Sequence, residues 1–119
     1  MNYRRGDVVM VDHPFSDARG SKVRPMLIVQ SDVRNQLLNH TVVAMLTTNL
    51  SFIGADPTQV LVDVTTPDGA GSGLSATSAV RCGNLFTLHE KFILRKIGAL
   101  SPVLMQQIDA GLRTALELP

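Results

Sequence analysis

Two arginines and a pair of threonines occupy positions at the ends of the apolar segments that we expect to form strands. Arg24 comes just before such a segment, Thr47 and Thr48 come just after another, and Arg81 lies near the end of a third. Antiparallel neighbours place the start of one strand beside the end of the next, so Arg24 and Thr47 are expected at the same rim. Guanidinium donors beside hydroxyls suit a phosphate, above all one that gains charge in a transition state.

Pro25 influences the backbone conformation of Arg24 and so the direction of its side chain. Proline fixes its own φ and biases the preceding residue toward extended geometry, so the Arg24 guanidinium is aimed from the junction of loop and strand. Each of these residues also has a purely structural explanation. Arg24 could pair with a carboxylate at a strand end, and Thr47 and Thr48 could reflect β-propensity and turn hydrogen bonding. The residues alone leave both interpretations open.

Other patterns that carry chemistry are missing from the sequence. It contains no glycine-rich phosphate loop, no HExxH and no nucleophile elbow. The histidines His13, His40 and His89 are scattered, without the spacing of metal ligands, so we expect no metal and no cofactor. Only His13 stays a candidate, because it is close in sequence to the Arg24 loop. No pair of carboxylates stands out for acid–base catalysis.

Composition favours one small globular domain over residues 1–119. The chain has 119 residues, 45 % of them hydrophobic, with no Trp and only 4 % aromatic residues. So few aromatics argue against modules that stack bases on exposed rings. Cys82 is the only cysteine, which excludes a disulfide within the chain and fits a reducing cytoplasm. We expect a soluble, unexported protein with no membrane contact, because no apolar run approaches membrane-spanning length.

Charge is distributed unevenly along the chain. The formal net charge is +1, but residues 1–34 hold six Lys and Arg, residues 35–80 hold none, and residues 81–119 hold five. A polyanion would therefore be bound by a local patch built from the two ends of the chain, not by a global positive field. Ordinary surface decoration is the alternative.

Hydrophobic patterning predicts many short strands and one long helix. We expect strands at Asp7–His13 and at residues 25–30, 41–46, 59–64, 76–82, 85–88 and 97–100. Loops are expected at residues 14–23, 50–58 and 65–75, the last being the most flexible, and short helical turns at residues 33–38 and 89–92.

The end of the chain carries the clearest helical pattern. Ser101 is suited to cap a helix and Pro102 to its first turn, followed by an apolar stripe of Leu104, Ile108, Leu112 and Leu116. Together these elements predict a mostly β fold, a small, partly open β-barrel with a C-terminal helix packed on it.

In its motifs and their order, the chain resembles a known family, the PemK/MazF toxins of type II toxin–antitoxin modules. The resemblance runs over almost the whole length, and the order and spacing of its pieces carry it. The matching pieces are Arg5-Gly6-Asp7-Val8-Val9, His13-Pro14-Phe15-Ser16-Asp17, Gly20-Ser21-Lys22-Val23-Arg24-Pro25, Met45-Leu46-Thr47-Thr48-Asn49, Gly73-Leu74, Ser78-Ala79-Val80-Arg81, Leu85-Phe86-Thr87-Leu88 and Arg95-Lys96-Ile97-Gly98-Ala99-Leu100-Ser101.

This resemblance implies a fold, a reaction and partners. Members have a Kid/CcdB-type barrel related to SH3 barrels, and are usually homodimers. They are typically metal-independent endoribonucleases that cut single-stranded RNA through the substrate's own 2′-OH, leaving a 2′,3′-cyclic phosphate and a 5′-OH. A cognate antitoxin neutralises them, and contact with DNA is expected only indirectly, through the antitoxin complex. Antitoxins of this kind typically wrap the toxin with a disordered, often acidic segment, which would suit the basic patches.

The resemblance also assigns roles to residues. The family's catalytic arginine before proline falls on Arg24, and its threonine at the end of the third strand falls on Thr47. In the Kid branch, an arginine in a Val-Arg-Cys stretch takes part in catalysis, and here that residue is Arg81. Contacts that hold the RNA strand are expected from a further set of residues: Ser21, Lys22, Thr48, Asn49 and His13. Bases would enter the loops at residues 14–22 and 49–58.

Two departures from the family pattern bear on the mechanism. The Kid branch has an aspartate, proposed as general base, two positions after its arginine, and this chain has Gly83 there. The Gly-Ser-Glu-Gln loop of many members is replaced by Gly20-Ser21-Lys22. The alternatives are a CcdB-like toxin that binds a protein target such as DNA gyrase, and a catalytically degenerate homologue that only binds an antitoxin.

Overall fold

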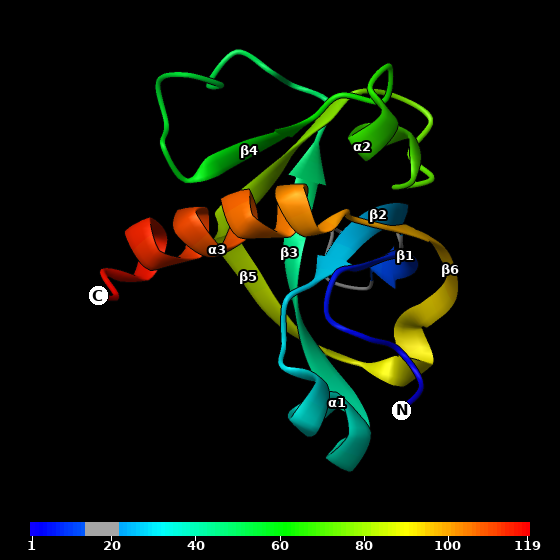
Figure 1. Cartoon of the computed structure of the whole chain (residues 1–119). Helices are drawn as coiled ribbons and strands as arrows, with labels where there is room; N and C mark the ends of the chain where they lie inside the picture. The colour runs from blue at the N-terminus through cyan, green and yellow to red at the C-terminus, as the bar shows by residue number, and fades with distance from the viewer. Residues whose placement is uncertain (14–21) are drawn as a thin grey trace.

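Six strands form one antiparallel sheet in the spatial order β4-β5-β3-β2-β1-β6 (Figure 1). The computed structural model describes residues 1–13 and 22–119. Its strands are β1 (Asp7–His13), β2 (Lys22–Ile28), β3 (His40–Thr47), β4 (Gln59–Val62), β5 (Ser78–His89) and β6 (Ile93–Ala99). Its helices are α1 (Asp32–Leu37), α2 (Pro67–Ala70) and α3 (Pro102–Leu116), with a 3-10 turn η1 (Glu90–Phe92). This mostly β sheet with a C-terminal helix confirms the predicted fold class.

The strand predictions for β1 and β3 are confirmed, the first with the same bounds. The predicted start of the second strand at Pro25 is wrong, because β2 begins at Lys22. Pairing with β1 in a hairpin explains the difference, since His13 lies opposite Lys22 and Val11 opposite Arg24. The extra residues lie in what the sequence predicts as loop, and the rest of that predicted loop lies outside the described residues.

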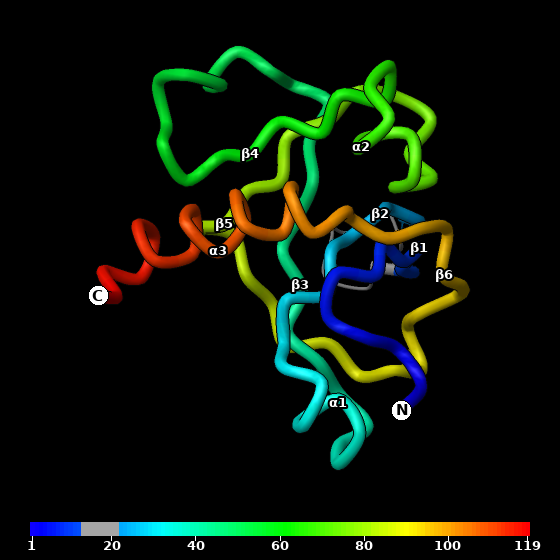
Figure 2. The backbone as a smooth tube through the Cα atoms, in the orientation of Figure 1, coloured from blue at the N-terminus to red at the C-terminus, as the bar shows by residue number. Residues whose placement is uncertain are grey.

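Strands later in the chain differ more from the prediction. The strands predicted at residues 76–82 and 85–88 are one strand, β5, which carries an irregularity: Ala44 pairs with Leu85, but the next residue, Met45, pairs with Arg81. Residues 82–84 therefore form a bulge, at which the strand bends, and the residues before it pair with β3 on one edge and with β4 on the other. The tube in Figure 2 follows β5 through this change of direction.

The two edge strands also have other bounds than predicted. β6 begins at Ile93 rather than at residue 97, because its first half pairs with β1. β4 ends at Val62 rather than at residue 64, where the Asp63 carboxylate accepts hydrogen bonds from the Thr65 N–H at 3.0 Å and hydroxyl at 2.7 Å and turns the chain.

Alternate residues of the central strands enter different parts of the core. Leu27 packs in a cluster with Val80 and the α3 residues Leu104 and Ile108. Its neighbours Met26 and Ile28 pack in a second cluster on the opposite face of the sheet. The unbroken apolar sequence of β2 therefore reflects burial on both faces, as its pattern predicts.

α3 lies across one face of the sheet (Figure 1). It begins as predicted, because the Ser101 hydroxyl accepts a hydrogen bond from the Leu104 N–H at 3.2 Å. Of the predicted stripe, Leu104 and Ile108 are buried, whereas Leu116 in the last turn is 52 % exposed. An ion pair of 2.7 Å between Arg5 and Asp109 joins the helix to the start of the chain.

The segment at residues 65–75, predicted as a long flexible loop, contains one short helix, α2, and is held by hydrogen bonds. The Thr66 hydroxyl caps α2 by accepting from the Gly69 N–H at 3.1 Å. The buried Ser72 hydroxyl donates to the Gly69 carbonyl at 2.6 Å and accepts from the Leu74 N–H at 3.2 Å. The two short helical turns predicted near residues 33–38 and 89–92 are confirmed as α1 and η1. No helix in the described part of the chain is long and apolar enough to cross a membrane.

Candidate active site

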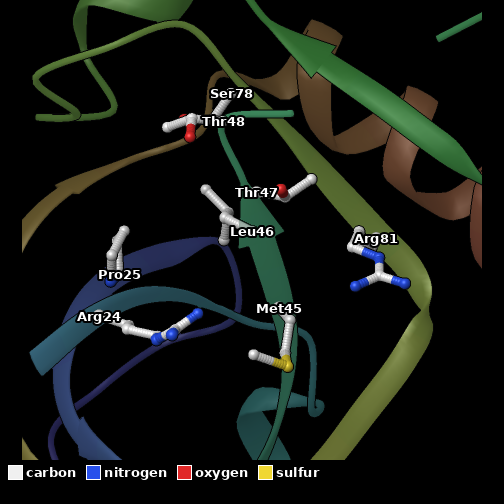
Figure 3. Close-up of a pocket in the computed structure, with 8 residues that line it drawn as sticks. All are labelled: Arg24, Pro25, Met45, Leu46, Thr47, Thr48, Ser78 and Arg81. Atoms are coloured by element: carbon white, nitrogen blue, oxygen red, sulfur yellow. The ribbon is translucent and has the colours of Figure 1, made fainter. Parts of the chain in front are cut away.

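A pocket of about 260 Å³ opens where β2, β3 and β5 meet at one rim of the sheet. Arg24, Thr47 and Arg81, the three residues that the sequence singles out for catalysis, all line it (Figure 3). Figure 3 shows Arg24 and Arg81 on opposite sides of β3, with Thr47 and Met45 between them. Residues from three separate parts of the sequence therefore meet at one cavity.

The strand register explains why these side chains share a face. Met45 lies opposite both Met26 and Arg81. Directly opposite residues and residues two apart in a strand share a face, so Arg24, Thr47 and Arg81 all lie on the face of Met26 and Met45. That is the face opposite the one covered by α3.

Pro25 explains why a pocket forms between β2 and β3. The Gly6 N–H donates to the Ile28 carbonyl at 2.8 Å, so the backbone groups of Ile28 point toward β1. Backbone groups of successive strand residues point to alternate edges of the strand. Pro25 is three residues before Ile28, and its backbone groups therefore point toward β3. Proline has no N–H to donate there, and the β2–β3 ladder ends one residue later, at Met26 and Met45. The two strands are thus unpaired at the position where Arg24 would face Thr47.

Thr47 is the last residue of β3, and a turn orients its hydroxyl. The Thr47 Oγ1 accepts a hydrogen bond from the Asn49 N–H at 3.1 Å. The Asn49 side chain in turn accepts from the Ser51 N–H at 3.0 Å and from its hydroxyl at 2.7 Å, which fixes the turn. Since the Thr47 hydroxyl donates to none of the described residues, its hydrogen is available to a ligand in the pocket.

The two guanidinium groups are also available to a ligand. Arg24 is exposed and Arg81 is half-buried, and neither forms an ion pair with another described residue. Arg81 lies between Met45 on β3 and Gln59 on β4 in the ladder. Two cations without an ion pair to a described residue, at the mouth of one cavity, make it a site for an anion.

Asp56, which precedes β4, interacts electrostatically with Arg81. Its pKa lies below its ordinary value, mainly because the Thr58 hydroxyl and N–H donate to Oδ1 at 2.7 and 2.9 Å, with a smaller contribution from the Arg81 charge. Burial, followed by the Asp56 charge, raises the pKa of the Cys82 thiol to about 11. Cys82 is therefore a neutral core residue rather than a nucleophile.

The residues predicted to hold an RNA strand lie at different distances from the pocket. Thr48 lines it, whereas Asn49 acts on it through the hydrogen bond to Thr47. Lys22 is exposed at the start of β2, in register with the backbone of His13 at the end of β1. Ser21 lies outside the described residues.

Several residues at the site are not indicated by any sequence pattern. Met45, Leu46 and Ser78 line the pocket because they neighbour Thr47 and Arg81 on β3 and β5. Gln59 lies opposite Arg81, and its Oε1 is buried without a hydrogen-bond partner among the described residues. A polar residue beginning a predicted strand is the only signal that the sequence offers for Gln59. In the described ranges, no three His, Cys, Asp or Glu side chains gather as a metal site would require.

Comparison with known proteins identifies the family. Residues 4–116 match the family described as PemK-like, MazF-like toxin of type II toxin–antitoxin system. The chain is a PemK/MazF-family toxin. Among curated relatives, the toxin is 31 % identical to endoribonuclease MazF2 of Mycobacterium bovis over 105 residues, 88 % of each chain. It is 27 % identical to endoribonuclease EndoA of Bacillus subtilis over 119 residues, 99 % of this chain and 97 % of the relative.

Solved structures agree with this assignment. The toxin matches an endoribonuclease in complex with its cognate antitoxin from a mycobacterial species, with a TM-score of 0.76 and 29 % identity, covering 98 % of this chain and 97 % of the other. A second mycobacterial endoribonuclease matches with a TM-score of 0.76 and 28 % identity, covering 100 % and 95 % of the two chains. The family expected from the sequence motifs is thereby confirmed.

Proposed function

We propose that this toxin is an endoribonuclease that cleaves single-stranded RNA by internal transfer. In this reaction the 2′-oxygen bonds to the adjacent phosphorus, the bond to the 5′-oxygen breaks, and the products carry a 2′,3′-cyclic phosphate and a 5′-OH. The observation that carries the proposal is the meeting of Arg24, Thr47 and Arg81 at one pocket, with both guanidinium groups free of ion pairs to described residues. Relatives that are named endoribonucleases support the same activity.

Arg24 is proposed to bind the scissile phosphate. It is exposed at the unpaired end of the β2–β3 ladder, so an RNA backbone can reach it without disturbing the sheet. A guanidinium can donate to two phosphate oxygens at once, and its charge offsets the negative charge that the pentacoordinate transition state gains. Arg24 thus acts on the reacting group itself.

Thr47 and Arg81 are proposed to complete the phosphate site. The Thr47 hydroxyl, which accepts from the Asn49 N–H, donates its hydrogen to a phosphate oxygen or orients the 2′-OH. Arg81, on the other side of β3, supports the phosphate or donates to the 5′-oxygen as it leaves. Ser21, Lys22, Thr48, Asn49 and His13 are proposed to hold the strand.

The proton of the 2′-OH has no protein acceptor among the described residues that line the pocket, which include no carboxylate and no imidazole. Gly83, which stands where the Kid branch has an aspartate, belongs to the bulge of β5 and has no side chain to offer. We propose that solvent or a phosphate oxygen of the substrate takes this proton. Neutralisation of the phosphate by two arginines favours the attack in either case.

The proposed partners follow from the family and from the surface. A cognate antitoxin would bind the toxin, as one binds the mycobacterial endoribonuclease, and would thereby neutralise it. We propose a single toxin domain over residues 1–119 that forms a homodimer in the cytoplasm and meets DNA only indirectly, through the antitoxin complex. Exposed apolar side chains such as Val33 and Leu37, one turn apart on α1, offer contact area.

The test is incubation of an end-labelled mixed RNA with the toxin in EDTA, followed by mapping of the cleaved ends. We expect defined cuts that leave a cyclic phosphate, and Arg24→Ala should lower cleavage at least about 100-fold without loss of fold, since one lost transition-state donor costs this much. Arg113→Ala, at an exposed position at the end of α3, is the matched control. Absence of cleavage by the folded wild-type toxin, with growth arrest retained, would instead support a protein target of the CcdB kind.

A further inference from the structure

A second cavity adjoins the active-site pocket across Pro25. It has a volume of about 250 Å³, and its lining includes Met10, Pro25, Leu74, Ser75, Arg95 and Ile97. Pro25 lines both cavities. Met10 lies opposite both Pro25 and Arg95, so these three residues stand side by side on β2, β1 and β6. They share the face of Val8, which belongs to the α3 side of the core, whereas Arg24 lies on the other face.

One wall of this cavity is held rigidly against β6. A Cβ on Gly73, whose φ is +74°, would lie 2.0 Å from the Ile97 carbonyl oxygen, and one on Gly98 would lie 2.4 Å from the Gly71 carbonyl oxygen. The Ala99 N–H also donates to the Gly71 carbonyl at 3.0 Å. Backbone-to-backbone packing of this kind leaves no room for the wall to slide, so the cavity is preformed. Figure 1 shows the segment between α2 and β5 beside the start of β2.

The lining suits a flat, partly polar ligand. Met10, Leu74 and Ile97 offer apolar contacts, and the exposed Arg95 forms no ion pair with another described residue. A phosphate alone would gain nothing from the apolar walls. A nucleobase would use all of them, because its face packs on aliphatic groups or stacks on a guanidinium while its edge bonds to hydroxyl and backbone groups.

We propose that this cavity binds the base of the nucleotide adjacent to the scissile phosphate and so sets part of the cleavage sequence. The proposal rests on the proposed RNA cleavage. With the phosphate on Arg24, the RNA chain passes the rim where β2 and β3 are unpaired, and the neighbouring base turns over Pro25 into the cavity. Base selection then comes from the loop at residues 71–75 and from β6, in addition to the loops predicted from the sequence.

The experiment uses oligonucleotides that contain the mapped cleavage site and carry a single abasic residue at each position flanking the cut. Ser75→Trp fills the cavity from an exposed position, and Arg95→Ala removes its cation. For the wild-type toxin, we expect kcat/KM to fall about ten-fold when one flanking base is missing, as the loss of one well-packed base contact implies. Both variants should lose about ten-fold on the intact oligonucleotide and show no further loss when that same base is missing.

Two matched controls isolate the cavity. Gln106→Trp adds the same bulk at an exposed position on α3, and Lys91→Ala removes a cation from η1. For both controls, kcat/KM should fall at the same abasic position, and by the same factor, as for the wild-type toxin. The inference is overturned if Ser75→Trp and Arg95→Ala, folded by circular dichroism, keep the wild-type penalty at every flanking position. Failure of the proposed function gives a different result, in which the wild-type toxin cuts none of the oligonucleotides.

Discussion

Gln59 on β4 and Arg81 on β5 occupy directly opposite positions in the antiparallel ladder, and the Gln59 Oε1 is buried without a hydrogen-bond partner among the described residues. An unpaired buried carbonyl is costly, and here it lies beside a group that can only donate. Because no hydrogen bond to the Gln59 oxygen holds Arg81, its guanidinium stays available to a phosphate in the pocket that it lines. We propose that Gln59, directly opposite Arg81, is a positioning residue for it.

The first prediction concerns this pair. Gln59→Glu places a carboxylate opposite Arg81, and the resulting ion pair should hold the guanidinium away from the RNA, so that kcat falls about ten-fold or more. The initial rate of cleavage at saturating RNA measures kcat. Gln106→Glu, which adds the same charge at an exposed position on α3, should cleave at the wild-type rate. An unchanged kcat for a folded Gln59→Glu protein would contradict the assignment.

The second prediction distinguishes the role of the Thr47 hydroxyl from the role of the side chain's shape. Thr47→Val keeps the β-branched outline but removes the proposed donor to the phosphate, so cleavage should fall about 100-fold. Thr47→Ser keeps the hydroxyl that accepts from the Asn49 N–H and should stay within about ten-fold of the wild type. The measurement is the cleavage rate of the wild type and of each variant on the same oligonucleotide. Equal rates for Thr47→Val and the wild type would show that the hydroxyl has only a structural role.

The sequence predicts the meeting of Arg24 with Thr47, because antiparallel pairing alone brings the start of one strand to the end of its neighbour. It does not predict how Arg81 joins them. Arg81 faces Met45 only because residues 82–84 leave the ladder, and neither Gly83 nor the short spacing to Leu85 distinguishes a bulge from two separate strands.

Other features depend on contacts between distant parts of the chain. Gly73 and Gly98 suggest turns or flexibility in the sequence, yet in the fold they allow two backbones to touch and form the wall of the second cavity. The orphaned Gln59 oxygen likewise results from the register of β4 against β5. Local pattern thus predicts most elements and the arginine and threonine that line the pocket from β2 and β3, and tertiary pairing decides the remainder of the lining.

A third prediction tests the role of Pro25 in opening the pocket. Pro25→Ala supplies an N–H that points toward β3, so the β2–β3 ladder can extend toward Leu46 and draw Arg24 against Thr47. We expect kcat/KM to fall about ten-fold with a change of less than about 1 kcal/mol in the free energy of unfolding, since one gained hydrogen bond offsets the lost rigidity of proline. Pro102→Ala, at the start of α3, is the control.

Hydrogen exchange gives the structural readout for that variant. The new amide at position 25 should exchange slowly if it bonds to β3 and quickly if it stays open to solvent. Fast exchange together with wild-type kcat/KM would show that the end of the ladder is not set by Pro25. Fast exchange with reduced activity would assign the effect to the aim of Arg24 instead.

The last prediction concerns Cys82, which is fully buried against α3 and whose pKa is raised from 9.0 to about 11. Because the folded chain keeps this proton when the unfolded chain has lost it, the stabilisation is complete below about pH 9 and is lost as the pH rises toward 11. Over that window the free energy of unfolding should fall by at most about 1.4 kcal/mol per pH unit on account of this thiol. Urea unfolding on both sides of the window, compared with Cys82→Ala, isolates its contribution. If Cys82→Ala shows the same pH dependence as the wild type, the thiol is not the group that titrates.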